Sequence, residues 1–549
     1  MTNQLRGPGS TRATIATASL KSLAATRIVR PYGPRKVVKV VKAVAQWGTG
    51  PAGGYAALAA RMPNGVAIID DRGELTFGQL HEEANALARA LAERGAGAGD
   101  RVALLCRNHR WFVESTVAVA RLGAHVLYLN TAFSGPQISE LLEREKPVAV
   151  IYDDEFTDVL AGIPASTSRL VAWVEDHEVA SDVPRVVDVV REHATTDLRP
   201  PASEGRTVIL TSGTTGTPKG ANRGSGSLTA AAALVSRIPL RYGWRIHIAA
   251  PMFHTWGWAH SNLSMMLGST LVLRRRFDPE SFLDTVAQSR SEAVIVIPVM
   301  LHRVLDLPVE VRAGYDFSSV RVIAASGSAL PGDLASEWMD AFGDTLYNTY
   351  GSTECAWATI AQPAEMRSHP GTAGRPPIGT TVSLFDDDGK PVNGDGTGRI
   401  FVANTAQFEG YTNGENKEII DGLMSTGDVG RFADGLLFVE GRDDEMIVSG
   451  GENVYPQEIE DCLSRHDAVL ECAAVPVDDP SFGQRLIAYV VTKPGSEATE
   501  YELKAHVKAH LARYKVPRDV CFLPELPRNS TGKVLKRELV EACSNRDEA

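Results

Sequence analysis

Residues 211–220 read TSGTTGTPKG and directly follow the apolar run 207–210. Glycine permits the positive φ angles with which successive backbone amides can converge on an anion, and the hydroxyl side chains add further donors. The Gly-Lys-Ser/Thr ending of a Walker A loop is absent. A flexible linker is the alternative, but a linker rarely follows a buried strand directly. We therefore predict a phosphate-binding loop made of Thr211, Ser212, Gly213, Thr214, Thr215, Gly216 and Lys219.

Helix-like stretches and short apolar runs alternate on both sides of this loop. Residues 77–94 have the periodicity of an amphipathic helix. This alternation predicts an α/β fold with mixed layers and largely parallel sheets. Short strands and turns in 379–441 predict a small β-rich lobe. Apolar runs typical of buried strands occur at 102–106, 149–152, 207–211, 247–251, 293–298 and 321–325.

Length and composition bound the organisation of this 549-residue chain. We expect a basic N-terminal segment (1–48), a large domain (49–441) and a small α+β domain (442–549). The formal net charge of −11 argues against nucleic acid as the main partner. The six cysteines show neither metal-type nor disulfide-type spacing, which favours a cytoplasmic location. No membrane-spanning helix is expected, and the oligomeric state is unknown.

The N-terminal segment differs in charge from the rest of the chain. Residues 1–69 contain ten Lys or Arg and no Asp or Glu. Within it, residues 35–47 predict an amphipathic helix with basic side chains on one face and valines and Trp47 on the other. Two interpretations stay open: contact with an anionic membrane surface, or packing on the main body with the lysines in water. The preceding stretch, 1–20, is expected to be mobile.

TSGTTGTPKG resembles the signature of the adenylate-forming superfamily, which contains acyl-CoA synthetases, firefly luciferases and nonribosomal peptide adenylation domains. The resemblance extends from about residue 50 to residue 540. It implies an ATP-dependent ligase that uses Mg²⁺. Tyr350-Gly351-Ser352-Thr353-Glu354 resembles the next family motif. By this resemblance Glu354 holds Mg²⁺ against the triphosphate, Thr353 donates to the α-phosphate, and Tyr350 stacks on the adenine.

Further motifs complete the nucleotide site that the resemblance implies. Ser326-Gly327-Ser328 resembles the adenine-binding turn, and Asp428 in the run STGD resembles the acceptor of both ribose hydroxyls. Arg442 would approach ribose and phosphate, and Asp444 aligns with the hinge about which the C-terminal domain turns.

Lys533, at the end of Pro527-Arg528-Asn529-Ser530-Thr531-Gly532-Lys533, resembles the family's catalytic lysine. A carboxylate must attack an anionic α-phosphate, and a mobile ammonium can bridge the two anions in the transition state. The alternative is a solvated surface lysine without a catalytic role. The ordered set of motifs favours the catalytic role.

Two segments bear on the acceptor and on the acid. The run Ser449-Gly450-Gly451-Glu452-Asn453-Val454-Tyr455 is typical of the acyl-CoA synthetase branch and implies a wall for coenzyme A made of Ser449, Gly450, Gly451, Glu452 and Tyr455. Because the given sequence ends at 549, we expect no carrier domain to follow. The basic residues usual beside this run are missing, and GRIFVANTAQFEGY departs from the family's β-lobe pattern.

The run PMFHTWGW resembles the family's PxxH motif at the acyl pocket and contributes His254, Trp256, Gly257 and Trp258. Core packing is an equal alternative for the two tryptophans. The apolar, Met-containing sequence that follows favours a medium- to long-chain fatty acid, while an aryl or branched acid stays open. Two rival functions are an acyl-AMP ligase that loads a carrier protein and a non-catalytic, membrane-associated scaffold.

Overall fold

The computed structural model describes most of the chain. None of the helices in this described part combines the length and apolar character needed to cross a bilayer. The described residues are 4–7, 12–28, 30, 33–164, 166–175, 182–211, 219–223, 228–392, 396–411, 416–443, 447–449, 452–479, 483–511, 515–529, 532–536 and 538–540.

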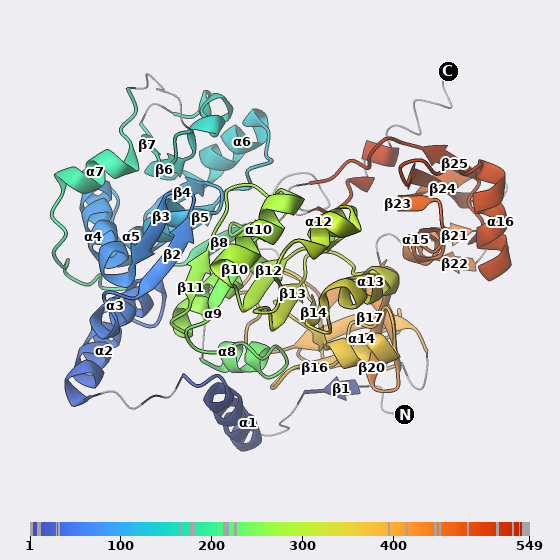
Figure 1. The fold of residues 1–549 in the computed structure, drawn as a ribbon, viewed down its shortest axis with the longest axis horizontal. Helices are drawn as coiled ribbons and strands as arrows, with labels where there is room; N and C mark the ends of the chain where they lie inside the picture. Colours follow the sequence, from blue (N-terminus) through green and yellow to red (C-terminus); the bar gives the residue numbers. More distant parts are fainter. Residues whose placement is uncertain are drawn as a thin grey trace.

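Two mainly parallel sheets form the centre of the large N-terminal domain (Figure 1). The eight-stranded sheet has the order β15-β14-β13-β12-β10-β11-β2-β3, and the six-stranded sheet has the order β7-β6-β4-β5-β8-β9. Only the terminal pairs β14–β15, β2–β3 and β8–β9 are antiparallel among the paired strands of these two sheets in the described chain. The strands are β2 (Val66–Asp70), β3 (Gly73–Thr76), β4 (Arg101–Leu105), β5 (His125–Tyr128), β6 (Ala149–Tyr152), β7 (Ser168–Val171), β8 (Thr207–Thr211), β9 (Lys219–Arg223), β10 (Arg245–Ile248), β11 (Thr270–Val272), β12 (Ala293–Val296), β13 (Val322–Ala325), β14 (Leu346–Tyr350) and β15 (Thr359–Ala361).

Helices cover these sheets and bury their apolar faces in a shared core. Helix α4 (Phe77–Glu93) begins at a capping box, in which the Thr76 hydroxyl accepts from the Gln79 amide at 3.2 Å. The other helices of the domain are α3 (Pro51–Arg61), α5 (Arg110–Arg121), α6 (Gly135–Glu145), α7 (Val186–Glu192), α8 (Leu228–Val235), α9 (Thr255–Met266), α10 (Pro279–Ser289), α11 (Pro298–Leu305), α12 (Val309–Ala313), α13 (Gly332–Phe342), α14 (Pro363–Ser368) and two short 3-10 turns, Asp154–Phe156 and Asp158–Leu160.

A β-rich lobe and a small α+β domain complete the fold. The lobe contains β16 (Thr381–Phe385), β17 (Gly398–Ala403), β18 (Ile419–Ile420), β19 (Leu423–Ala433) and β20 (Leu436–Arg442). The C-terminal domain contains β21 (Ile447–Ser449), β22 (Glu452–Val454), α15 (Pro456–Ser464), β23 (Val469–Asp479), β24 (Gly483–Thr492), α16 (Glu500–His510) and β25 (Asp519–Phe522). The predicted α/β class, with a large N-terminal and a small C-terminal domain, is confirmed. The exact domain boundaries stay a prediction.

The described part of residues 1–20, the stretch that was expected to be mobile, contains a strand and the start of a helix. Strand β1 (Gln4–Arg6) pairs antiparallel with the edge strand β16, and the Gly7 amide donates to the Thr380 carbonyl at 2.8 Å. An extended segment can satisfy the open backbone groups of an edge strand whatever its side chains are, so composition does not reveal this pairing. Helix α1 (Arg12–Ala25) follows, and α2 (Pro34–Trp47) is the predicted amphipathic helix.

Candidate active site

A cleft of about 1050 Å³ lies beside the carboxyl ends of the parallel strands β10, β12, β13 and β14, between the two domains. Ligands of open α/β sheets bind at this edge, because the loops that follow neighbouring strands meet there. Of the sequence-predicted residues that the structure describes, the cleft brings together most: His254, Trp256, Trp258, Ser326, Gly327, Ser328, Tyr350, Gly351, Thr353, Glu354, Asp428, Arg442 and Lys533.

Two glycines that follow the strands leave part of the cleft wall without side chains. Gly327, directly after β13, has a φ of 102°, a conformation that side chains other than glycine rarely adopt. A Cβ atom added to Gly351 would lie 2.3 Å from the Ala356 carbonyl oxygen, so the turn after β14 has no room for a side chain. The Ser326 hydroxyl ties the two turns together by donating to the Thr349 carbonyl at 2.8 Å. A flat ring can therefore approach the backbone here.

Tyr350 and Asp428 form a half-buried pair that lines the cleft. The Tyr350 hydroxyl donates to Asp428 Oδ2 at 2.6 Å, and the Arg442 guanidinium lies 3.6 Å from Asp428 Oδ1. Burial raises the pKa of Asp428, although the Tyr350 hydrogen bond and the charges of Arg442 and Lys533 act in the opposite direction. The carboxylate that was predicted to hold ribose is thus oriented by an aromatic hydroxyl from the neighbouring motif.

Glu354 has a partner that the motif analysis did not identify. The Tyr411 hydroxyl donates to Glu354 Oε1 at 2.5 Å. Tyr411 also forms a β-bridge with Ala221 in β9, the strand that leaves the predicted phosphate loop. The β lobe therefore connects the candidate metal-binding carboxylate to the strand at the base of the phosphate loop. Tyr411 is the last residue of the run FEGY. Because this run departs from the family pattern, the motif analysis did not select the tyrosine.

The segment from His254 to Trp258 forms the apolar side of the cleft. Burial lowers the pKa of His254 to about 4, so its imidazole is neutral at physiological pH. The Trp256 indole donates to the Val296 carbonyl at 3.0 Å, which fixes the ring against β12. Gly257 is not part of the cleft wall, since a Cβ atom there would lie 2.4 Å from the Pro251 carbonyl oxygen. Trp256 thus packs against β12 and also lines the cleft. Core packing and a place at the acyl pocket, the two alternatives for this residue, hold together.

Lys533 enters the cleft from the C-terminal domain. Its backbone amide donates to Asn529 Oδ1 at 2.9 Å, and its carbonyl accepts from the Asn529 amide at 2.9 Å. The preceding Gly532 packs so closely on α11 that an added Cβ would lie 2.3 Å from Val299 Cγ1. This tight turn presents an exposed lysine to the nucleotide side of the cleft, where its charge partly offsets the burial that raises the pKa of Asp428.

The other predicted residues fall into three groups. Thr211 and Lys219 are backbone partners at the ends of β8 and β9, and Ser449 and Glu452 are partners between β21 and β22. Tyr455 lies at a neighbouring hollow with Glu440 and Asp443 rather than in the cleft. The following predictions lie outside the described residues: Ser212, Gly213, Thr214, Thr215, Gly216, Asp444, Gly450 and Gly451.

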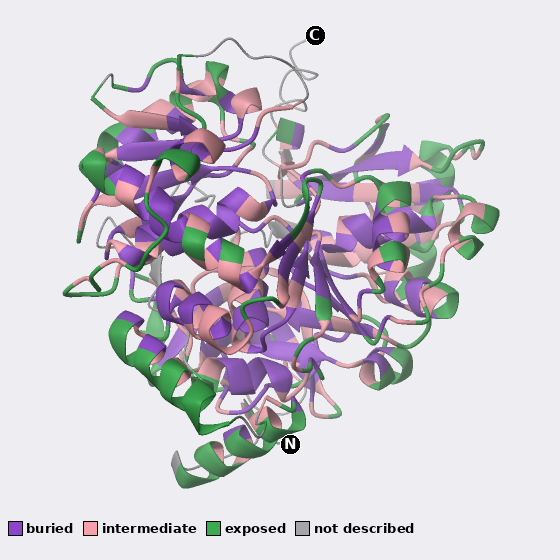
Figure 2. Ribbon diagram, turned by 60° about the vertical axis from the view of Figure 1, so that its left-hand side comes forward, coloured by how far each residue is buried: buried purple, intermediate pink, exposed green. Residues whose placement is uncertain are grey.

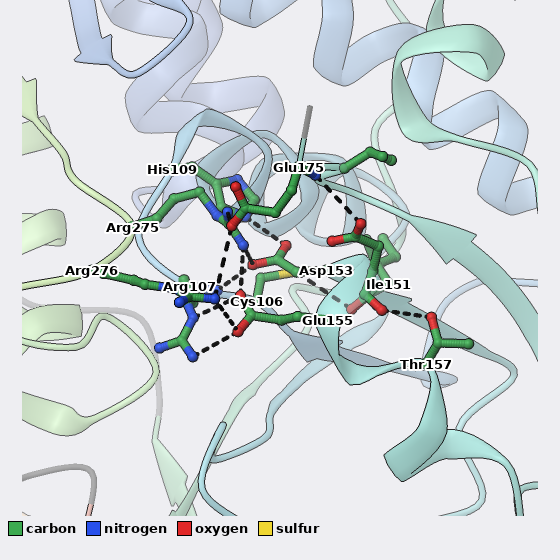
Figure 3. Close-up of polar contacts among 12 residues, drawn as sticks. Cys106, Arg107, His109, Ile151, Asp153, Glu155, Thr157, Glu175, Arg275 and Arg276 are labelled. Atoms are coloured by element: carbon green, nitrogen blue, oxygen red, sulfur yellow. Dashed lines mark hydrogen bonds and ion pairs between the residues drawn. The ribbon is translucent and has the colours of Figure 1, made fainter. Parts of the chain in front are cut away.

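A separate buried cluster joins the two large sheets (Figure 3). Asp153, after β6, accepts from His109 Nε2 at 2.7 Å, and its other oxygen lies 3.6 Å from Arg275, after β11. Burial alone raises the pKa of Asp153, but His109 and Arg275 outweigh it and lower that pKa. Ligand atoms of Cys106, His109 and Asp153 lie within 4.8 Å of one another. Because Arg275 already neutralises the carboxylate, we interpret the cluster as a structural connection rather than a metal site.

Comparison with known proteins gives the family. The model of the AMP-binding enzyme matches residues 56–412, and that of the AMP-binding enzyme C-terminal domain matches residues 458–533. The chain belongs to the AMP-binding enzyme family. The resemblance stated from the motifs is confirmed, and this AMP-binding enzyme is an AMP-forming ligase.

Three relatives illustrate the range of this family. The AMP-binding enzyme is 33% identical over 488 residues to the feruloyl-CoA synthase of Amycolatopsis sp, which covers 87% of this chain and 96% of that protein. It is 29% identical over 492 residues to the fatty acid–acyl-carrier-protein ligase ScoC of Streptomyces coeruleorubidus, with 87% and 93% covered. The structure of the anthranilate CoA ligase AuaEII in complex with anthranoyl-AMP is similar with a TM-score of 0.79 and 26% identity, covering 89% of this chain and 96% of that one.

Asn108 holds the segment that leads to His254 in this AMP-binding enzyme. It follows β4, is 5% exposed, and donates to the carbonyls of Ile248 and Ala250 at 3.0 and 2.9 Å. Its Oδ1 accepts from the Met252 amide at 2.9 Å. One amide side chain therefore satisfies three backbone groups of the stretch between β10 and the acyl side of the cleft. Asn108 belongs to none of the sequence motifs, so the sequence analysis did not identify it.

Replacing Asn108 with alanine is expected to raise the KM for the acid by about tenfold or more, because displacement of a positioning segment weakens substrate alignment. The KM for ATP is expected to stay within about twofold, since the nucleotide residues follow other strands. Steady-state pyrophosphate exchange measures both. Asn85→Ala is the matched control: Asn85, on α4, is also buried, but it donates to the Thr195 carbonyl and does not line the cleft. If Asn108→Ala raises the KM for ATP as much as the KM for the acid, or if Asn85→Ala raises the KM for the acid equally, Asn108 contributes only to stability.

Proposed function

We propose that this AMP-binding enzyme activates a carboxylic acid as an acyl-adenylate and then transfers the acyl group to coenzyme A. The supporting observation is one cleft that carries a neutral imidazole and apolar side chains on one side, and Asp428, Glu354 and Lys533 on the other. The apolar side suits the tail of an acid, and the charged side suits a nucleotide. The names of relatives, such as feruloyl-CoA synthase, support the same two-step reaction.

In the first half-reaction a carboxylate oxygen of the acid attacks the α-phosphorus of ATP, and the bond to pyrophosphate breaks. Asp428 accepts hydrogen bonds from the ribose, Thr353 donates to the α-phosphate, and Lys533 bridges the two approaching anions. Glu354 is the residue that would hold Mg²⁺, since carboxylate oxygens are its preferred ligands and Tyr411 orients this one. When bound, the ion would neutralise charge on the triphosphate.

In the second half-reaction the sulfur of coenzyme A attacks the acyl carbon, the bond to AMP breaks, and the thiol proton leaves to solvent. We propose that the C-terminal domain first turns about Asp444, which withdraws Lys533 and presents the Ser449–Tyr455 run. Two glycines, Gly450 and Gly451, would give a thin pantetheine arm a wall free of side chains. His254 would separate the acid from the thiol, and as a neutral ring it can sit beside both.

The acid that we propose first is a medium- to long-chain fatty acid. Ala230 and Ala231 of α8 and Leu263 and Met266 of α9 also line the cleft, so its acyl side has an apolar wall beside Trp258. An aryl acid is the second candidate, because the AMP-binding enzyme resembles a feruloyl-CoA synthase and an anthranilate CoA ligase. Two indole rings beside the imidazole also suit a flat substrate.

A panel of carboxylic acids tests this proposal most directly. We expect ATP–pyrophosphate exchange to depend on the acid, and aliphatic acids of increasing chain length to give the highest kcat/KM, by about tenfold or more over benzoate and cinnamate types. The reverse order would establish the aryl alternative. Exchange with none of the acids by a folded protein would overturn the adenylation proposal and favour a non-catalytic scaffold.

The acceptor needs its own assay. We expect coenzyme A to release AMP from the bound adenylate, with formation of the thioester. The relative ScoC is named for transfer to an acyl-carrier protein, so phosphopantetheinylated carrier protein is the control acceptor. Thioester on the carrier and none on coenzyme A would replace this half of the proposal and leave the adenylation half intact. The cysteine pattern supports a cytoplasmic place for the reaction.

A further inference from the structure

Helix α2 lies outside the residues that the family model matches. It spans Pro34–Trp47 and therefore precedes residue 56, where the match to the AMP-binding enzyme begins. Helices α1 and α2 both lie at the lower edge of the molecule in Figure 1, and Figure 2 shows both as mostly exposed. None of the sequence motifs assigned to the cleft lies on this helix, so its surface is considered by itself.

One side of α2 is docked on the enzyme. Ala43 and Trp47 are 8% and 6% exposed and form a small apolar cluster with residues of α3. The guanidinium of Arg121 lies 5.8 Å from the centre of the Trp47 ring, which adds a cation–π contact. Val40 and Val44, on the same side, are half-buried. The helix thus has a fixed orientation relative to the catalytic domain.

The opposite side exposes apolar surface. Val37, Val38 and Val41 are 45%, 65% and 61% exposed. At about 100° per residue they form one strip, which we call the valine strip. Packing on the main body therefore explains Trp47 and leaves the valine strip without a function. A contiguous apolar surface beside charged residues is a mark of an interaction site.

Positive charge borders the valine strip. Arg35, Lys39 and Lys42 follow it around the helix, all three are exposed, and residues 1–69 contain no acidic side chain. Apolar side chains flanked by Lys and Arg match the boundary between acyl chains and anionic headgroups. A cationic strip disfavours a second copy of itself, because two such surfaces repel each other.

We propose that the valine strip binds the surface of a bilayer that contains anionic lipids, with Arg35, Lys39 and Lys42 at the headgroups. This proposal rests on α2 alone and is independent of the proposed catalytic function. It also has a consequence for the cleft. Helix α3 lies against α9 so closely that a Cβ added to Gly54 would lie 2.3 Å from Met265 Sδ. Helix α9 also carries Trp256 and Trp258, so α3 connects the docked helix α2 to the helix that lines the acyl side of the cleft.

Vesicle co-sedimentation of the full chain tests the proposal. We expect binding to vesicles of phosphatidylcholine with phosphatidylglycerol, weak binding to phosphatidylcholine alone, and loss of binding at high salt. The variant Arg35→Gln, Lys39→Gln, Lys42→Gln is expected to weaken the partition coefficient by about 100-fold. The variant Val37→Asn, Val38→Asn, Val41→Asn is expected to weaken it by about tenfold or more.

A matched control separates the valine strip from exposed apolar surface in general. Val309, Ile419 and Tyr501 are 64%, 60% and 81% exposed on other elements, and their joint replacement by asparagine is expected to leave vesicle binding unchanged. Pyrophosphate exchange in solution should be unchanged in all three variants, which shows that each is folded. Equal binding to both vesicle types, no binding by the wild type, or full binding by the α2 variants would overturn the proposal. So would self-association that depends on the valine strip without vesicle binding.

Discussion

Lys533→Ala is expected to slow adenylation by about 10³-fold while thioester formation from supplied acyl-AMP stays within a few-fold of the wild type. The reason is electrostatic. The acid and the α-phosphate are both anionic, and Lys533 is positioned by a tight turn against α11 to bring an ammonium between them. The second half-reaction is attack on the acyl carbon of the mixed anhydride and not on the anionic phosphate, so it does not need this charge. Acid-dependent pyrophosphate exchange measures the first step, and thioester release from synthetic acyl-AMP measures the second.

Lys536→Ala is the matched control for this prediction. Lys536 lines the same cleft from the same segment, but its ammonium lies 2.9 Å from Glu460 within the C-terminal domain. Its loss is expected to change adenylation by less than about tenfold. Loss of both half-reactions in a folded Lys533→Ala protein would remove the assigned role, and so would unchanged exchange. A parallel loss in Lys536→Ala would indicate that the segment's general charge, and not the position of Lys533, is what matters.

The sequence was a good guide to the interior of the fold because buried parallel strands have a distinctive composition. The apolar runs at 102–106, 149–152 and 293–298 correspond to β4, β6 and β12 within about two residues. The predicted run 247–251 is the instructive difference, since β10 ends at Ile248. The residues after it are apolar, but Asn108 from another sheet takes their backbone hydrogen bonds. Strand composition alone cannot distinguish the two arrangements.

The candidate site was predictable where a residue lies inside a recognisable motif, as Ser326, Glu354 and Asp428 do. It was not predictable where the contact joins distant segments. Glu354 and its donor Tyr411 are 57 positions apart, and Asn108 and the Ile248 carbonyl are 140 apart. Such pairs are fixed by how the sheets and the lobe pack, and no local pattern encodes that packing. The N-terminal helix shows the same limit: periodicity predicted both faces of α2, but only packing shows which valines stay exposed.

Glu354→Gln is expected to lower the adenylation rate by about 100-fold or more and to raise the Mg²⁺ concentration needed for half-maximal rate. Glutamine keeps the size of the side chain and can still accept from Tyr411, but it is a far weaker ligand for a hard cation than a carboxylate. A loss that saturating Mg²⁺ partly restores would place the defect at the metal. Pyrophosphate exchange across a Mg²⁺ titration, at saturating ATP and acid, measures both effects.

Tyr411→Phe separates the ligand role of Glu354 from its positioning. The substitution removes the hydroxyl that donates to Glu354 Oε1 and keeps the ring that packs on Phe408. Because the carboxylate survives, we expect a loss of about tenfold at most, with a smaller change in Mg²⁺ dependence than in Glu354→Gln. If Tyr411→Phe equals Glu354→Gln in both respects, the hydroxyl must contribute more than orientation. If Glu354→Gln leaves the Mg²⁺ dependence unchanged, the metal is held elsewhere in the cleft and Glu354 serves to anchor the lobe through Tyr411.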